Sequence, residues 1–151
     1  MRCPATFEGW ERRETWEKVI APPSPRSAED GSEVKPHRGS ATWNPFRKRW
    51  VTIFTQVQGK PSPFGEIWYA EASSPMGPWG KAVKVLTHDN YTFYNPRIHP
   101  ELTPADASFI VFEGTYTAEF ANHAEKTPRY NYNQILYRLD LDDPKLAPAR
   151  E

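Results

Sequence analysis

Alternating apolar and polar positions divide much of this chain into short strands. In residues 50–57, Val51, Ile53 and Thr55 fall on one side of an extended backbone, and Trp50 and Phe54 fall on the other. β-Branched and aromatic residues of this kind favour strands. The pattern therefore predicts a strand at residues 50–57, and similar runs predict strands at 66–72, 109–116 and 133–141.

Weaker signals complete the predicted order. Short strands are expected at residues 40–43 and 91–94, and residues 81–86 carry lysines that suit an edge strand. Residues 15–20 favour a strand, with a short helical turn as the alternative. Prolines punctuate residues 21–36, which predicts a surface loop, and the residues after Pro144 are expected to form a frayed tail.

Two parts of the chain repeat the same order of features. Tyr94-Asn95-Pro96 repeats Trp43-Asn44-Pro45, and His88 repeats His37 at the same spacing. Each copy is expected to contain a short strand, an Asn-Pro turn, a strongly apolar strand, a loop and a further strand. A repeat of about 50 residues is the size of a propeller blade. Two meanders of a β-sandwich are the alternative.

The fold class predicted from these patterns is all-β, with antiparallel sheets arranged as about two blades of a β-propeller. Residues 1–36 are expected to hold a partial strand region and a proline-rich loop. Residues 37–87 would form the first blade, and residues 88–151 the second blade and the tail.

Composition narrows the classes of partner. Nineteen basic and nineteen acidic side chains cancel, so no overall field favours nucleic acid or an acidic membrane. The single cysteine, Cys3, excludes an intramolecular disulfide and a cysteine-rich zinc site. The first residues lack the pattern of a signal peptide, and no apolar run approaches the roughly 20 residues that span a bilayer.

The most chemically varied stretch is residues 94–102. Arg97 can hold a carboxylate or hydroxyl groups through its planar guanidinium, and His99 can titrate near neutral pH. Asn44 and Asn95 offer the paired donor and acceptor that sugar hydroxyls require. The alternative is a buried polar network in which Arg97, His99 and Glu101 hold adjacent blades together.

Several further residues bear on catalysis and binding. Glu101 and Glu113 are candidates for the two carboxyl groups that glycoside hydrolysis needs. Trp43 could stack on a sugar, although such aromatics often pack between blades. The four histidines show no metal-binding spacing, so neither a metal nor a cofactor is expected. The basic run at residues 47–49 is expected to be a solvated hairpin tip.

The run from Ser40 to Pro45, with Arg49-Trp50-Val51, resembles a blade opening of five-bladed propellers related to glycoside hydrolase families 43, 32 and 68. Tyr94-Asn95-Pro96-Arg97 resembles a second opening. Residues 66–70 and 74–79 resemble the third strand and following turn of such blades. The resemblance covers about residues 37–141 and extends to uncharacterised bacterial proteins.

This resemblance implies a portion of a carbohydrate-active propeller that binds or processes glycans. It implies an extracellular or periplasmic location, with catalytic roles for Glu101 and Glu113. Asn44, Asn95, Arg97, His99 and Trp43 would bind substrate. The alternative is a non-catalytic binding or scaffold module. The related hydrolases often carry Arg-Asp-Pro where this chain has Asn-Pro, and this chain alone is not expected to be a competent hydrolase.

The length of the chain fits only part of such a ring. Five blades need on the order of 250 residues, so a C-terminal portion of a longer protein, or a truncated reading frame, is expected. Two blades alone would leave apolar faces exposed, and these faces could drive self-association. A small self-associating β-protein of unrelated function is a third reading.

Overall fold

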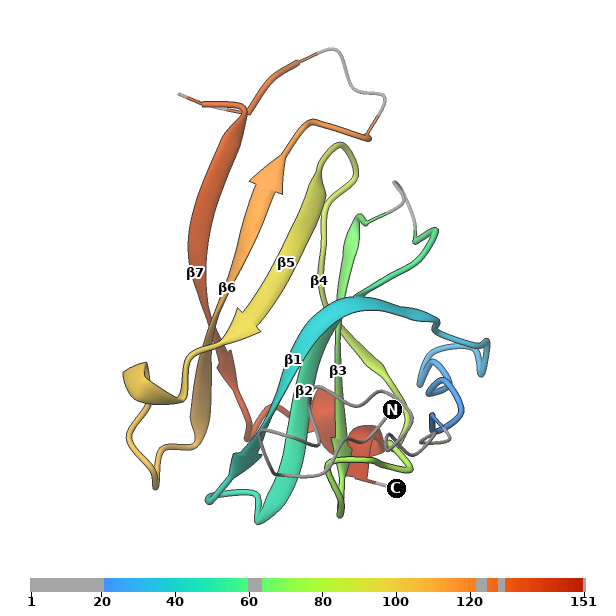
Figure 1. The fold of residues 1–151 in the computed structure, drawn as a ribbon, viewed down its shortest axis with the longest axis vertical. Helices are drawn as coiled ribbons and strands as arrows, with labels where there is room; N and C mark the ends of the chain where they lie inside the picture. Colours follow the sequence, from blue (N-terminus) through green and yellow to red (C-terminus); the bar gives the residue numbers. More distant parts are fainter. Residues whose placement is uncertain (1–20, 60–63, 122–124, 128–129, 151) are drawn as a thin grey trace, which may run out of the picture.

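The computed structural model describes residues 21–59, 64–121, 125–127 and 130–150, and over these residues the chain is all-β (Figure 1). The strand predicted at residues 15–20 lies outside this part. Two antiparallel sheets hold seven strands, and two short 3-10 helices complete the described elements. In chain order they are β1 (Pro36–Asn44), β2 (Arg49–Gln56), β3 (Glu66–Ala72), β4 (Val83–Thr87), β5 (Thr92–Ile98), η2 (Pro100–Leu102), β6 (Phe109–Thr117), β7 (Tyr132–Asp140) and η3 (Pro144–Arg150).

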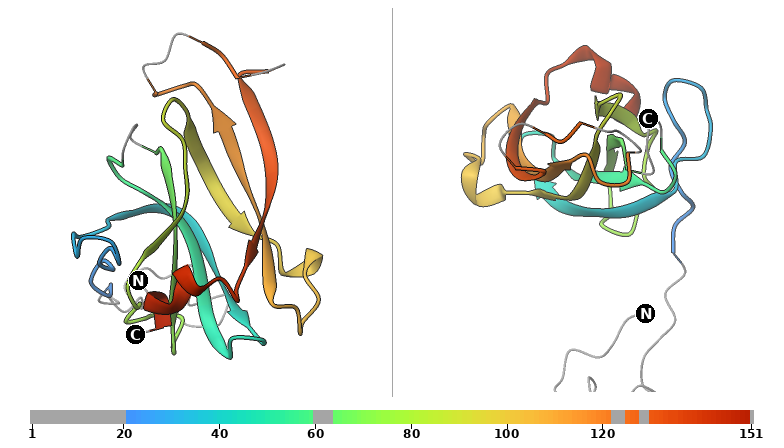
Figure 2. Two further views of the ribbon diagram at one scale, coloured as in Figure 1. Left: turned by 180° about the vertical axis from the view of Figure 1, so that it is seen from behind. Right: turned by 90° about the horizontal axis from the view of Figure 1, so that it is seen from above.

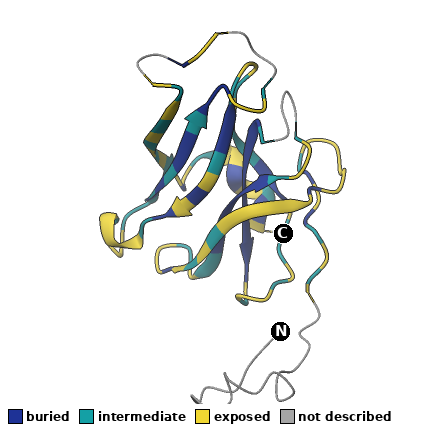
Figure 3. Ribbon diagram, turned by 45° about the horizontal axis from the view of Figure 1, so that its top comes forward, coloured by how far each residue is buried: buried dark blue, intermediate teal, exposed yellow. Residues whose placement is uncertain are grey.

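The first sheet has the order β1-β2-β3-β4, so the predicted edge position of the lysine-bearing strand is confirmed. All seven residues of β3 are buried, because this strand lies between two others and both faces are covered. Much of β1, in contrast, is exposed (Figure 3). The alternation in β2 is confirmed as well, since Val51 and Ile53 enter one apolar cluster and Phe54 enters another.

The second sheet has the order β5-β6-β7. β6 and β7 pair without interruption, from Phe109 opposite Asp140 to Thr117 opposite Tyr132. The two sheets fall on either side of residue 88, where the sequence pattern places the division between repeats. None of the described helices is long and apolar enough to cross a membrane.

The main core lies between the two sheets. Val51, Ile53 and Tyr69 of the first sheet belong to the same buried cluster as Phe93 and Phe112 of the second. The opposite face of the first sheet is covered by the proline-rich loop, which buries Val34 against Phe54 and Trp68. Removing this apolar surface from water is the principal stabilisation of the arrangement.

The expected frayed tail is wrong. Residues 144–150 form η3, which packs against β3 and β4 alongside the lower part of the first sheet (Figure 2). Leu146 is 1% exposed and Ala149 is fully buried, and both belong to the main core. The three-residue spacing of these two side chains matches the period of a 3-10 helix, which places them on one face.

The expected Asn-Pro turn in the second repeat is also wrong. Asn44-Pro45 does begin the turn between β1 and β2, but Asn95-Pro96 lies inside β5. The pairing with β6 shifts between Tyr94 and Arg97, and Asn95 has a φ of 47°. Asparagine tolerates this left-handed conformation better than most residues, and proline has no N–H to place in a ladder, so the dipeptide forms an irregularity within the strand.

The basic run at residues 47–49 is not a solvated tip. The Arg47 side chain is 6% exposed, and its Nε lies 3.0 Å from Oε1 of the fully buried Glu71. Arg49 Nε lies 3.4 Å from Oε2 of the same carboxylate, and the Tyr69 hydroxyl donates to Oε1 at 2.8 Å. Burial, followed by the Glu71 charge, raises the pKa of Tyr69. The β1–β2 turn is therefore held to the central strand by a buried ion network.

Candidate functional site

β1 and β5 each form one edge of their sheet, and these two edge strands lie side by side (Figure 1). The backbone N–H of Ile98 donates to the hydroxyl oxygen of Ser40 at 2.7 Å, which joins the strands directly. An open cleft of about 560 Å³ is formed here by residues 37–40 of β1 and residues 95–97 of β5. Asn95 and Arg97, two of the residues predicted to bind substrate, therefore line one cleft together.

Backbone irregularities on both strands shape this cleft. On β5 the left-handed Asn95 and the following proline interrupt the ladder. On β1 the pairing shifts between Pro36 and Gly39. A Cβ added to Gly39 would lie 2.1 Å from the carbonyl oxygen of Ile53, so the close approach of β1 to β2 at this point requires glycine.

An aromatic cluster borders the cleft. The His37 ring centroid lies 4.5 Å from that of Phe64 and 6.3 Å from that of Tyr94. Phe64 and Tyr94 are 5.9 Å apart, and Phe120, which is 65% exposed, lies 6.3 Å from Phe64. Aromatic faces of this kind can stack on the apolar faces of sugars. Sequence reasoning missed Phe64 and Phe120, because both lie in loops without a strand pattern.

The charged side chains that line the cleft are basic, while Arg97 also lies opposite Glu113 in the ladder and its charge acts on Glu101. Arg38, Arg97 and His37 line the cleft, and no acidic residue is among its lining residues in the described part of the chain. Arg38 was not singled out from the sequence, where it is one of many basic residues. The cleft can therefore offer guanidinium donors to hydroxyl or carboxylate oxygens.

His99 and the two predicted catalytic glutamates form a second cluster, just beyond the end of β5. His99 Nδ1 lies 2.7 Å from Oε1 of Glu101, and Nε2 lies 3.3 Å from Oε2 of Glu113. The turn of η2 brings Glu101 back toward His99, and the pairing of Arg97 with Glu113 places the second carboxylate across the ladder. The structure thus brings all three predicted residues together, with the imidazole between the carboxylates.

The cluster changes the acidity of its members. The hydrogen bond to Glu101 raises the pKa of His99 above its ordinary value of 6.5, against a smaller opposing effect of burial. The same bond lowers the pKa of Glu101 below 4.5. Each shift favours the charged form that the partner stabilises. The arrangement therefore stabilises the protonated imidazole of His99 and the ionised carboxylate of Glu101.

A pH titration can check this pairing. The contact between His99 and Glu101 is expected to stabilise the fold fully below pH 6.5 and to be lost as pH rises through the raised pKa of His99. At the acid end it is lost as Glu101 is protonated, below pH 4.5. The stability lost in Glu101→Gln should therefore be largest between these values, and NMR should show the imidazole pKa of His99 falling in that variant.

Glu119→Gln, which changes an exposed glutamate elsewhere, serves as the control for this titration. It should leave both the imidazole pKa and the stability profile unchanged. An unchanged His99 pKa in Glu101→Gln would show that the two side chains do not interact in solution.

Trp43 and Asn44 lie at the other end of β1, away from the cleft. The Asn44 side-chain oxygen accepts the N–H of Arg47 at 2.8 Å, and the residue is 5% exposed, so its amide caps the turn. Trp43 is 46% exposed and meets Trp50 edge to face at 6.2 Å. Both Trp43 and Asn44 line a small, mainly apolar recess of about 170 Å³ that is closed by Ile98 and the turn after β5.

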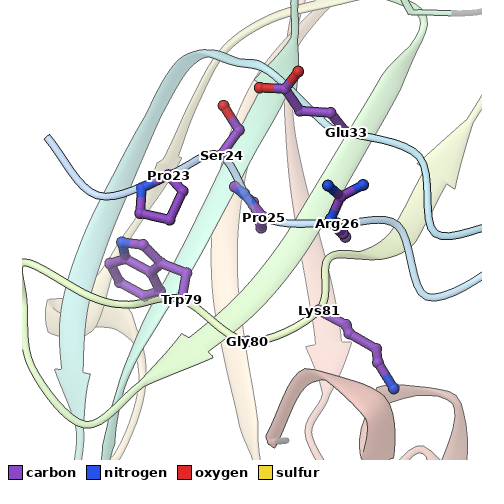
Figure 4. A pocket seen from close by; sticks show the side chains of 8 residues that line it. All are labelled: Pro23, Ser24, Pro25, Arg26, Glu33, Trp79, Gly80 and Lys81. Carbon is purple, nitrogen blue, oxygen red and sulfur yellow. The ribbon is translucent and has the colours of Figure 1, made fainter.

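A further cleft of about 440 Å³ lies beside the proline-rich loop (Figure 4). Pro23 and the ring of Trp79 lie next to each other there, whereas Lys81 extends away toward η3. Arg26 donates from Nη1 to the carbonyl oxygen of Gly31 at 3.0 Å, and the lining also includes Glu33. This cleft is lined by both acidic and basic side chains, and Arg26 is already hydrogen-bonded within its own loop. It therefore has fewer free donors for a charged ligand than the cleft between β1 and β5.

No group of three or more histidine, cysteine or acidic side chains in the described residues is arranged to hold a metal ion. Comparisons with protein-family models, curated proteins and solved structures find no match to this chain.

Proposed function

We propose that this chain is a portion of a carbohydrate-active β-propeller and that it binds a glycan in the cleft between β1 and β5. One observation carries the proposal. Asn95 and Arg97 line the same cleft as residues 37–40 of β1, close to the aromatic rings of Phe64 and Tyr94. Amide and guanidinium groups suit sugar hydroxyls, and the rings suit the apolar faces of pyranoses.

The basic lining of the cleft favours an acidic glycan. Arg38 and Arg97 can each form two parallel hydrogen bonds with a carboxylate, which is a stronger interaction than a neutral hydrogen bond. The proposed ligand is therefore an oligosaccharide that carries uronic acid groups. A neutral oligosaccharide of the same length would bind less tightly.

Binding is favoured over cleavage by the surroundings of the two glutamates. A glycosidase needs one carboxylic acid and one carboxylate on opposite sides of the scissile bond, with space for the sugar and for water. Here the His99 ring occupies the space between Glu101 and Glu113, and its contact lowers the pKa of Glu101, which disfavours a general acid. The proposed role of this cluster is to hold the turn after β5 in place.

Substitutions in the cleft test the proposal. Arg97→Ala is expected to weaken binding of an acidic oligosaccharide by tenfold or more, because roughly 1.5–3 kcal/mol is typical for hydrogen bonds to a charged group. Asn95→Gly removes the amide while keeping a residue that tolerates the left-handed backbone, so it should also weaken binding without loss of stability. Isothermal titration calorimetry, after a glycan array has selected the ligand, measures both effects.

Arg150→Ala is the matched control, because Arg150 is an exposed arginine at the end of η3. It should bind as the unchanged chain does. The scaffold alternative predicts a different result, namely no glycan bound by the unchanged chain and a lower melting temperature in Arg97→Ala. Release of reducing ends that is abolished by Glu113→Gln would instead establish cleavage.

A further inference from the structure

One edge of the second sheet is long and open. β7 has nine residues and pairs with β6 along its whole length, and no strand in the described part of the chain pairs with its other side (Figure 1). The outer edge of the first sheet, β4, is less open to pairing with another strand. Ala82, just before β4, already forms a bridge with Ser27, and β4 itself has five residues and carries the charged Lys84. β1 and β5 face each other. Among the described strands, β7 therefore has the edge with the most free hydrogen-bonding capacity.

The ladder with β6 shows which backbone groups of β7 point outward. Leu141 N–H donates to the carbonyl oxygen of Ser108 at 2.7 Å, so the residue just after β7 directs its backbone toward β6. In an antiparallel pair this direction alternates along the strand. The outward groups therefore belong to the even-numbered residues, which are Tyr132, Gln134, Leu136, Arg138 and Asp140.

We propose that two copies of this chain associate by pairing β7 with β7, antiparallel, about a two-fold axis at Leu136. This register overlaps all nine residues of both strands and pairs outward groups with outward groups, which would join the two second sheets into one six-stranded sheet. A symmetric contact of this kind is isologous, and strand addition at an open edge is a common mode of recognition.

The side chains fit this register. Gln134 would lie opposite Arg138, and Tyr132 opposite Asp140, so that no two like charges face each other. Moving the axis to Arg138 would instead place two guanidinium groups opposite each other, which is destabilising. In this register Leu136, which is 60% exposed, meets its own copy at the axis.

The positive charge of Arg138 does not prevent a second strand from pairing with β7, because Asp140 of the same strand neutralises it. Its Nε lies 2.8 Å from Oδ1 of Asp140, and its guanidinium carbon lies 4.0 Å from the centre of the Phe109 ring. A contact made by one strand from each copy is small compared with stable protein interfaces, so the dimer should be reversible and dependent on concentration.

Sedimentation velocity of the whole chain tests the association. At a concentration on the order of 100 µM, as suits a small interface, the unchanged chain is expected to sediment largely as a dimer and to dissociate on dilution. Leu136→Lys would place two ammonium groups opposite each other at the axis and should give a monomer at every concentration. Leu102→Lys adds the same charge at a leucine that is 51% exposed in η2, and it should still give a dimer.

Cysteine cross-linking tests the register. In a chain carrying Cys3→Ser, Leu136→Cys should form a disulfide between two copies, because opposite residues of a hydrogen-bonded pair lie about 5.5 Å apart. The register places residue 134 of one copy opposite residue 138 of the other. Gln134→Cys alone, or Arg138→Cys alone, should therefore cross-link weakly, whereas a mixture of the two variants should cross-link efficiently. These experiments use no glycan, so they are independent of the proposed function.

Three outcomes would overturn the inference. The first is a monomer at the highest concentration that the chain tolerates. The second is a dimer that Leu136→Lys leaves intact. The third is efficient cross-linking of Gln134→Cys with itself, which would show a different register. Circular dichroism of each variant verifies that it remains folded.

Discussion

Replacing Glu71 with glutamine is expected to lower the free energy of unfolding by about 3–5 kcal/mol, because it removes the anion from a buried ion network. Arg47, with a side chain that is 6% exposed, would keep its charge without a compensating carboxylate. The amide oxygen of glutamine can still accept a hydrogen bond from the Tyr69 hydroxyl. The loss of stability is therefore due mainly to the missing negative charge. Thermal unfolding should show a melting temperature lower by roughly 10 °C.

Glu33→Gln is the control for this substitution. Glu33 also faces a basic residue, Lys35, but the two atoms are 4.0 Å apart and both side chains are more than half exposed. Exposed pairs contribute about 0–1 kcal/mol, so the melting temperature should change little. Equal effects of the two substitutions would mean that Glu71 is not a buried charge in solution.

Leu146→Ala is expected to cost about 2–5 kcal/mol of stability, since it removes a large side chain from the main core and leaves a cavity. Chemical denaturation with urea measures this loss. The same substitution at Leu102, which is 51% exposed, should change stability by less than about 0.5 kcal/mol. If Leu146→Ala were as mild as Leu102→Ala, η3 would not be docked on the sheet.

Local alternation was enough to predict most strands. Residues 66–72 coincide with β3, and the predictions for β2, β6 and β7 are off by only a residue or so at their ends, because β-branched and aromatic side chains favour a pleated, buried surface. The burial of Glu71 could not be predicted in this way. Its partners Arg47 and Arg49 come from the preceding turn, and only the pairing of β2 with β3 brings them together.

The two Asn-Pro dipeptides show why the candidate site was only partly predicted. Asn44 ends a strand, and its amide is used to cap the turn, whereas Asn95 lies within a strand beside a cleft. The Asn-Pro dipeptide is the same in both places, but its neighbouring strand is not. β2 begins at Arg49, opposite Asn44, so β1 ends there, whereas β6 continues past Asn95 and β5 continues with it. The grouping of His99 with Glu101 and Glu113, in contrast, could be approached from sequence, since two of the three are neighbours in the chain and the third lies on the next strand.

The docking of η3 on the first sheet also constrains the order in which this protein can mature during synthesis. The residues of β3 leave the ribosome long before residues 144–150, yet Leu146 and Ala149 complete the core beneath them. Until those residues emerge, the nascent first sheet exposes apolar side chains that its final structure conceals, and it is vulnerable to aggregation during that interval. A ribosome that stalls just before residue 144 would therefore hold a chain in which the seven described strands are synthesised but the main core still lacks Leu146 and Ala149.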